Sequence, residues 1–153
     1  MRRTLVRGSD GRLARVAATA KRLEYAVSVG RDGAARSVEG GSTIEREDEW
    51  SAEHLVLAGL CRCTQTSLEY HARRANVRAT ADVGAHGVVT KRESDGRYAF
   101  VEIDVDLDAV LDPPLAGEEL RALLQKAERD CFVGASLTAP PRYHWTVEGE
   151  ELG

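Results

Sequence analysis

The longest amphipathic pattern in the chain runs from Ser51 to Val77 and predicts a helix. Ser51 is a favourable N-cap, and Glu53 falls in the first turn, where the helix dipole favours a negative charge. A helix that is apolar nearly all round is typically buried at the centre of a fold. Two neighbouring stripes predict such a helix here: Val56, Leu60, Cys63, Ser67 and Tyr70 form the first, and Leu57, Cys61, Thr64, Leu68 and Ala72 form the second.

Alternating apolar and polar residues predict strands on both sides of this helix. Residues 1–17 have the pattern of a hairpin with a turn at residues 9–11. Turn residues at 30–33 and 94–96 separate later strands, and the clearest strand alternates between an apolar and a polar face. The predicted strands after the hairpin cover residues 22–29, 34–41, 77–83, 99–107 and 143–147.

A second helix is predicted from Gly117 to about Cys131. Its buried stripe carries Cys131 at the end of the helix, in line with Leu120, Leu124 and Ala127. The order of strands, helix, strands, helix and strand indicates an α+β domain, in which antiparallel sheets pack against the helices. Because two apolar helices need more cover than one small sheet provides, we predict that two chains share a core as a homodimer.

The composition is that of an ordinary globular domain, with 153 residues, 42% hydrophobic and 30% charged. A formal net charge of −4, without a block of lysine and arginine, argues against binding to nucleic acid or to a membrane surface. No apolar run approaches the roughly 18 residues that would predict a membrane-spanning helix. The basic N-terminus lacks the apolar segment of a secretory signal, so a cytoplasmic protein is expected.

Three cysteines in such a chain do not form a disulfide framework. Cys61 and Cys63 share their segment with His54 and His71, but the spacing is not that of a structural zinc site. We therefore predict neither a metal site nor a cofactor. The cysteines are either small buried residues or reactive thiols, and the carboxylate ten residues before Cys63 favours thiol redox chemistry.

The residues around Cys63 and Cys131 resemble those of the osmotically inducible protein C and organic hydroperoxide resistance (OsmC/Ohr) superfamily. The segment 51–55 places Glu53 ten residues before Cys63, as in the family, and residues 126–131 end the second helix with Lys-Ala and then cysteine. The resemblance spans roughly residues 18–147. It implies an OsmC-like fold with antiparallel sheets packed on two long central helices, formed by an intertwined homodimer. Residues 1–153 would then be a single OsmC-like domain, with residues 1–17 as an N-terminal hairpin extension.

The resemblance also implies a function, that of a cysteine-based peroxidase with peroxiredoxin-like activity that reduces organic hydroperoxides in oxidative-stress defence. Hydroperoxides of fatty-acid type are one candidate class of substrate. Cys63 would attack the peroxide, and Cys131 would resolve the sulfenic acid. An external dithiol, lipoyl-type or similar, would then reduce the disulfide. The alternative is an OsmC-fold protein without peroxidase turnover that acts as a scaffold or binds a small apolar ligand.

In the family, the glutamate and an arginine position and activate the attacking thiolate, and Glu53 takes the first of these roles. Arg22 lies 31 residues before Glu53, close to the family separation, and is preferred. Arg31 is the alternative, because it stands in a Gly-Arg-Asp-Gly sequence that resembles a family motif.

The chain also departs from the family pattern around the cysteines. Ala52 and Phe132 stand where the family has proline, and the acidic run 45–49 replaces a glycine-rich loop. Cys61 is an additional cysteine. Two positions along a helix do not share a face, so Cys61 is expected to point away from Cys63 and to fill the core.

Overall fold

The structure of the protein is a computed structural model that describes residues 21–45 and 50–153. The described residues fall into two compact units, one over residues 21–45 and one over residues 50–153. The predicted hairpin over residues 1–17 lies outside the described residues. The expectation of one domain over the whole chain stays a prediction.

The first unit contains an antiparallel pair of short strands, β1 (Val27–Val29) and β2 (Ala35–Ser37). The turn between them ends at Gly33, whose φ of 83° favours glycine. The Asp32 carboxylate accepts a hydrogen bond from the Ala34 N–H and pairs with Arg36, so the turn residues are held by side-chain contacts. Both predicted strands and their turn are confirmed, although the strands are shorter than predicted.

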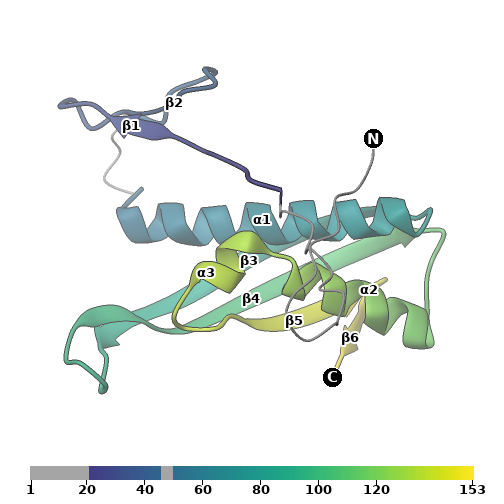
Figure 1. Cartoon of the computed structure of the whole chain (residues 1–153). Coiled ribbons are helices and arrows are strands. Elements are labelled where there is room, and N and C mark those ends of the chain that lie inside the picture. The colour runs from purple at the N-terminus through teal and green to yellow at the C-terminus, as the bar shows by residue number, and fades with distance from the viewer. Residues whose placement is uncertain (1–20, 46–49) are drawn as a thin grey trace, which may run out of the picture. The chain divides into compact units, whose positions relative to one another are not determined.

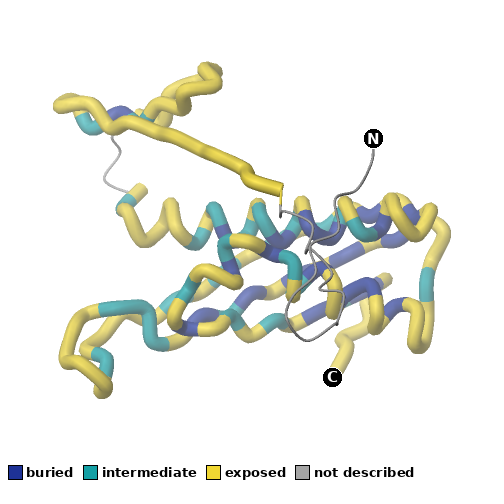
Figure 2. The backbone as a smooth tube through the Cα atoms, in the orientation of Figure 1, coloured by how far each residue is buried: buried dark blue, intermediate teal, exposed yellow. Residues whose placement is uncertain are grey.

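The second unit begins with a 23-residue helix, α1 (Ala52–Arg74). The Ser51 side chain accepts a hydrogen bond from the His54 N–H, and the His54 ring accepts one from the Ser51 N–H, which forms a capping box. Only one face of α1 is buried (Figure 2). Val56 and Tyr70 are 38% and 49% exposed, so the prediction that the helix is buried nearly all round is wrong for the single chain.

A four-stranded sheet lies beside α1 (Figure 1), and its strands run in the order β3 (Arg78–Lys91), β4 (Tyr98–Asp112), β5 (Arg142–Val147) and β6 (Glu150–Leu152). The β3–β4 and β5–β6 pairs are antiparallel, but β4 and β5 are parallel. The prediction of purely antiparallel sheets is therefore wrong. A parallel pair needs a long crossover, and here helices occupy the connection between β4 and β5.

The alternation in β4 separates a buried face from an exposed one, as predicted. Ile103, Val105 and Leu107 are at most 2% exposed and point toward the helices, whereas the aspartates between them face away. Asp104 joins β4 to β5 through hydrogen bonds from Arg142 at 2.9 and 2.6 Å. The Arg142 guanidinium, assisted by His144, lowers the pKa of Asp104 to about 2.

The second helix, α2 (Gly117–Arg129), has 13 residues, and a short helix, α3 (Phe132–Ser136), follows it. Asp130 is the C-cap of α2, and Cys131 is the N-cap of α3. The predicted helix from Gly117 to about Cys131 is confirmed to within two residues, and Cys131 begins α3 because its sulfur accepts a hydrogen bond from the Gly134 N–H. Among the residues that the structure describes, α1 alone exceeds 13 residues, so the prediction of two long central helices is not confirmed.

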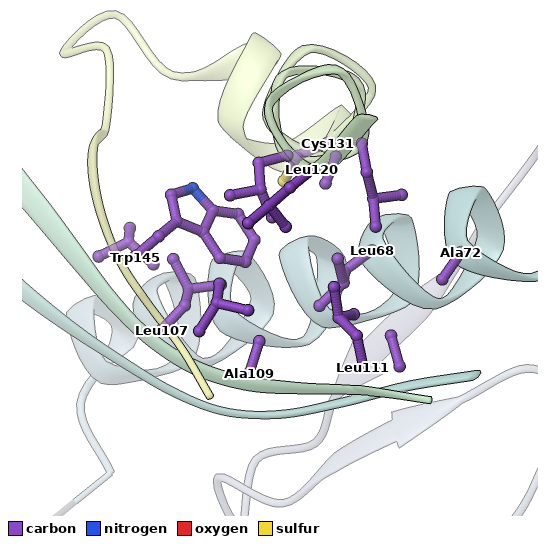
Figure 3. Packing of buried hydrophobic residues seen from close by; sticks show 14 of the residues in the cluster. Leu68, Ala72, Leu107, Ala109, Leu111, Leu120, Cys131 and Trp145 are labelled. Atoms are coloured by element: carbon purple, nitrogen blue, oxygen red, sulfur yellow. The ribbon is translucent and has the colours of Figure 1, made fainter. Parts of the chain in front are cut away.

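The end of α2 is attached to both neighbouring layers. The Trp145 indole N–H on β5 donates a hydrogen bond to Glu128 at 2.7 Å, and His71 Nε2 on α1 lies 2.8 Å from Asp130 Oδ2. Buried side chains from α1, α2, β4 and β5 meet in one cluster (Figure 3). These contacts fix the position of the α2–α3 junction, and with it the position of Cys131.

Strand β6 was not predicted, because two of its three residues are glutamates and all three are exposed. Glu148 and Gly149 before it have φ values of 52° and 80°, as a tight two-residue hairpin requires. Within the described residues, no helix has both the length and the hydrophobicity needed to cross a membrane.

Candidate thiol site

Two cysteines from separate elements meet where α1 passes the α2–α3 junction. Cys63 lies in the middle of α1, whereas Cys131 lies between α2 and α3. Cys131 is fully buried in the cluster shown in Figure 3, and Cys63 packs against that cluster while remaining partly exposed. The Cys63 sulfur accepts a hydrogen bond from the Val133 N–H, two residues after Cys131, and Cys131 raises the pKa of Cys63. All three cysteines of the chain are free thiols.

Cys131 is surrounded by polar contacts although it is buried. The backbone N–H of Gly134 donates a hydrogen bond to its sulfur at 3.4 Å. The hydroxyl oxygen of Thr64 lies 3.5 Å from the same sulfur, and that hydroxyl also donates to the Leu60 carbonyl oxygen at 3.0 Å. The thiol is therefore held in a defined orientation.

Cys63 receives a hydrogen bond on its sulfur from the Val133 backbone N–H at 3.5 Å. Burial raises the pKa of the Cys63 thiol, the Val133 N–H opposes this change, and the neighbouring Cys131 adds to it. The groups that act on this pKa belong to the junction that carries Cys131. In these surroundings Cys63 favours the neutral thiol, so a reactive thiolate needs a further positive charge.

Apolar side chains lie next to the core cluster that contains Cys131. Half-buried hydrophobic residues pack against this cluster, as Cys63 does, and they include Leu57, Phe100, Val133 and Leu137. A Cβ atom on Gly87 would lie 2.5 Å from the Phe100 ring, so the glycine leaves room for the ring at this point of β3. The two cysteines therefore belong to an apolar part of the chain.

Tyr143, on β5, completes the surroundings of Cys131. Burial raises the pKa of Tyr143 to about 12, and Cys131 and Thr64 also act on it. A Cβ atom on Gly134 would lie 2.7 Å from the Tyr143 hydroxyl oxygen and 3.4 Å from the Cys131 sulfur. The absence of a side chain at Gly134 thus leaves room for the tyrosine hydroxyl beside the thiol.

Glu53 is not brought to Cys63 within the chain. It lies in the first turn of α1, fully exposed, and hydrogen bonds from its own backbone N–H and from Ser51 lower its pKa. The ten residues between Glu53 and Cys63 correspond to about 15 Å along a helix at 1.5 Å per residue.

The two candidate arginines belong to the first unit. Arg22 is exposed and pairs with Glu24, with 2.5 Å between Nε and Oε1. Arg31 is exposed in the turn between β1 and β2. The choice between them therefore stays open.

Cys61 is half-buried and lies outside the core cluster, so the expectation that it fills the core is wrong. It lines a groove of about 530 Å³ between α1 and β3, together with Trp50, Leu57 and Ala81. Burial raises the pKa of this thiol as well. No group of three or more histidine, cysteine or acidic side chains within residues 21–45 and 50–153 is arranged to hold a metal ion.

The sequence did not point to the polar neighbours of Cys131. Thr64 lies on the predicted stripe next to that of Cys63, and Tyr143 lies on the apolar face of a predicted strand. Both positions carry a hydroxyl on a face predicted to be buried. Because a buried hydroxyl needs a hydrogen-bond partner, these two positions could have indicated polar contacts inside the core.

The OsmC-like protein family matches residues 45–146 of the chain. Solved structures of similar fold include an OsmC-like protein of unknown function from Vibrio cholerae, with a TM-score of 0.70 and 12% identity, covering 82% of this chain and 100% of that one. The organic hydroperoxide resistance protein OhrB of Bacillus subtilis has a TM-score of 0.53 and 20% identity, over 82% of this chain and 96% of that one.

An organic hydroperoxide resistance protein from Elizabethkingia anophelis has a TM-score of 0.56 and 22% identity, over 86% of this chain and 99% of that one. No curated protein sequence matches the chain. At these identities the solved structures support the α+β fold.

Proposed function

The chain belongs to the OsmC-like protein family, and from this premise we propose that it is a thiol-dependent peroxidase that reduces organic hydroperoxides in oxidative-stress defence. The observation that carries the proposal is the pairing of a partly exposed Cys63 with a buried Cys131 in apolar surroundings. The names of the structural neighbours from Bacillus subtilis and Elizabethkingia anophelis, as organic hydroperoxide resistance proteins, support it.

The two cysteines have different roles in the proposed reaction. The Cys63 thiolate attacks the peroxide, so that an S–O bond forms and the O–O bond breaks. Cys63 becomes a sulfenic acid, and the alkoxide takes up the proton that the thiol released on ionisation and leaves as an alcohol. Cys131 then attacks the Cys63 sulfur, so that an S–S bond forms, the S–O bond breaks and water leaves. An external dithiol, of lipoyl type or similar, reduces the disulfide by exchange. Cys63 takes the first step because it is the more exposed of the two thiols.

A cation is needed beside Cys63, because burial raises the pKa of this thiol. The proposed cation is Arg22, with Arg31 as the alternative. A guanidinium close to a thiolate lowers its pKa by about 1–3 units in comparable ion pairs. Glu53 holds the arginine through a bidentate pair and leaves the remaining N–H groups to the sulfur.

A homodimer follows from the position proposed for Glu53. The separation of about 15 Å along α1 is longer than a glutamate side chain can bridge, so Glu53 serves the Cys63 of a second copy. The exposed face of α1 offers apolar side chains for such an interface, including Leu55, Val56 and Tyr70.

Mixing two inactive variants tests this arrangement. Glu53→Ala and Cys63→Ser are each expected to lose most of the hydroperoxide turnover. A mixture unfolded and refolded together is expected to regain about a quarter of the original turnover, because half of the dimers are mixed and each has one complete site. A mixture that remains inactive, while the refolded unsubstituted protein is active, would contradict a site shared between copies.

Counting free thiols tests the proposed activity itself. The reduced protein has three free thiols per chain, and cumene hydroperoxide is expected to remove two of them. Because Cys63 packs against an apolar cluster, the same concentration of hydrogen peroxide is expected to act at least about tenfold more slowly, as the loss of apolar contacts worth about 1–3 kcal/mol implies.

The second candidate is an OsmC-fold binding module without turnover. The raised pKa of Cys63 favours it, because a neutral thiol reacts poorly with peroxides. A count of three free thiols per chain after an excess of cumene hydroperoxide would support this candidate and reject the peroxidase.

A further inference from the structure

The hydrogen bonds around Cys131 fix the direction in which its thiol proton points. Thr64 is fully buried, and its hydroxyl has one proton, which it donates to the Leu60 carbonyl oxygen at 3.0 Å. Its oxygen can therefore only accept at the contact of 3.5 Å with the Cys131 sulfur. The S–H proton of Cys131 consequently points to Thr64.

The sulfur of Cys131 has two lone pairs besides this proton. The Gly134 N–H donates to the sulfur at 3.4 Å and occupies one lone pair. The second lone pair is left to the two remaining neighbours of this sulfur, the Cys63 thiol and the Tyr143 hydroxyl, whose pKa values Cys131 raises. Thr64 and Gly134 together therefore orient Cys131 as a nucleophile toward Cys63.

Tyr143 limits access to this arrangement. Its hydroxyl oxygen occupies the space above Gly134, 2.7 Å from where a Cβ atom would lie. Cys131 and Thr64 are both 0% exposed, so water does not replace the threonine as acceptor of the S–H proton. The orientation of the thiol depends on the protein alone.

We propose that Thr64 is the positioning residue of the second thiol: its hydroxyl oxygen holds the S–H proton of Cys131 so that a sulfur lone pair faces Cys63 while the disulfide closes. This inference rests on the proposed two-cysteine reaction. In that step the Cys131 sulfur is oxidised and the sulfenic sulfur of Cys63 is reduced. The hydroxyl of the sulfenic acid leaves with the proton of Cys131 as water.

The test measures the rate at which the Cys63–Cys131 disulfide forms in a single turnover. The protein is the full chain with the Cys61→Ser substitution, which is called the background protein. Thr64→Val removes the hydroxyl at nearly constant shape, and Thr64→Ser keeps it as the matched control. Cumene hydroperoxide and diamide serve as separate oxidants. With diamide, Cys63 adds to the N=N bond and Cys131 displaces the resulting hydrazine. Quenched samples are analysed by intact mass, with dimedone to capture sulfenic acid in the hydroperoxide reaction.

Thr64→Val is expected to slow closure about tenfold with either oxidant, as the loss of one hydrogen bond at a barrier implies. More dimedone adduct is expected on Cys63, while the first step keeps its rate and Thr64→Ser stays within about twofold of the background. Thr64→Ala is the second variant, in case the valine disturbs folding, and the same slowing is expected.

Equal closure rates in the background and Thr64→Val proteins would overturn the inference, as would equal slowing in Thr64→Val and Thr64→Ser. Failure of diamide to link Cys63 to Cys131 in the background protein would overturn it too. Slowing with diamide in a protein that does not react with cumene hydroperoxide would support the positioning role and reject the peroxidase.

Discussion

Replacing Cys63 by serine is expected to reduce organic hydroperoxide turnover by more than about 1000-fold, because a hydroxyl at this position cannot replace the thiolate nucleophile. The substitution removes one sulfur atom from a half-buried position, so the fold is expected to remain intact. The measurement is steady-state consumption of cumene hydroperoxide with an excess of a dithiol reductant.

Cys61→Ser is the matched control for this experiment. Cys61 lies two positions away on the same helix and is also half-buried, but it lines the groove between α1 and β3. Its replacement is expected to change turnover by less than about twofold, since surface or groove changes away from a site have small effects. Equal losses in both variants would show that the helix, rather than the Cys63 sulfur, was affected.

The largest effect on stability is expected from the core beneath the helices. Leu107 is 2% exposed and lies in the cluster between β4 and the helices (Figure 3). Leu107→Ala is expected to lower the free energy of unfolding by about 3–4 kcal/mol, because it removes buried apolar surface and leaves a cavity. The measurement is urea unfolding at a fixed protein concentration.

Val110→Ala is the control on the same strand. Val110 is 52% exposed and lies on the opposite face of β4. Its replacement is expected to cost less than about 1 kcal/mol, mainly through the lower strand preference of alanine. Similar losses for the two variants would contradict the assignment of the two faces of β4.

The sequence predicted the elements whose signals are local. Ser51 begins α1 because its side chain caps the helix, and this depends on the next few residues only. The alternation in β4 was visible because one face is buried along the whole strand. The turn at residues 30–33 was predicted for the same kind of reason, since its glycines are local signals.

The differences between prediction and structure arise where a local pattern competes with contacts made by other elements. The apolar period of α2 continues through Cys131, but the cap of α3 takes that residue instead. The parallel pairing of β4 and β5 depends on how the intervening helices return the chain to the sheet. Neither outcome is encoded in the residues of one element.

The candidate site also contains some residues that the sequence identified and others that it did not. The two cysteines were identified from their spacing and helix contexts, and the structure places the Cys63 sulfur against α3, the helix that Cys131 caps. Thr64 and Tyr143 were not identified, because a hydroxyl on a buried face gives no indication of which partner it meets. The roles of Arg22, Arg31 and Glu53 stay predictions, since they depend on contacts beyond one compact unit or one chain.

Mapping the disulfide after one equivalent of cumene hydroperoxide tests the central claim most directly. The reduced protein is oxidised, free thiols are blocked with an alkylating reagent, and the digested chain is analysed by mass spectrometry. We predict a linkage between Cys63 and Cys131 within one chain, with Cys61 recovered as the blocked thiol. A linkage through Cys61, or recovery of Cys63 and Cys131 as blocked thiols, would contradict a two-cysteine peroxidase.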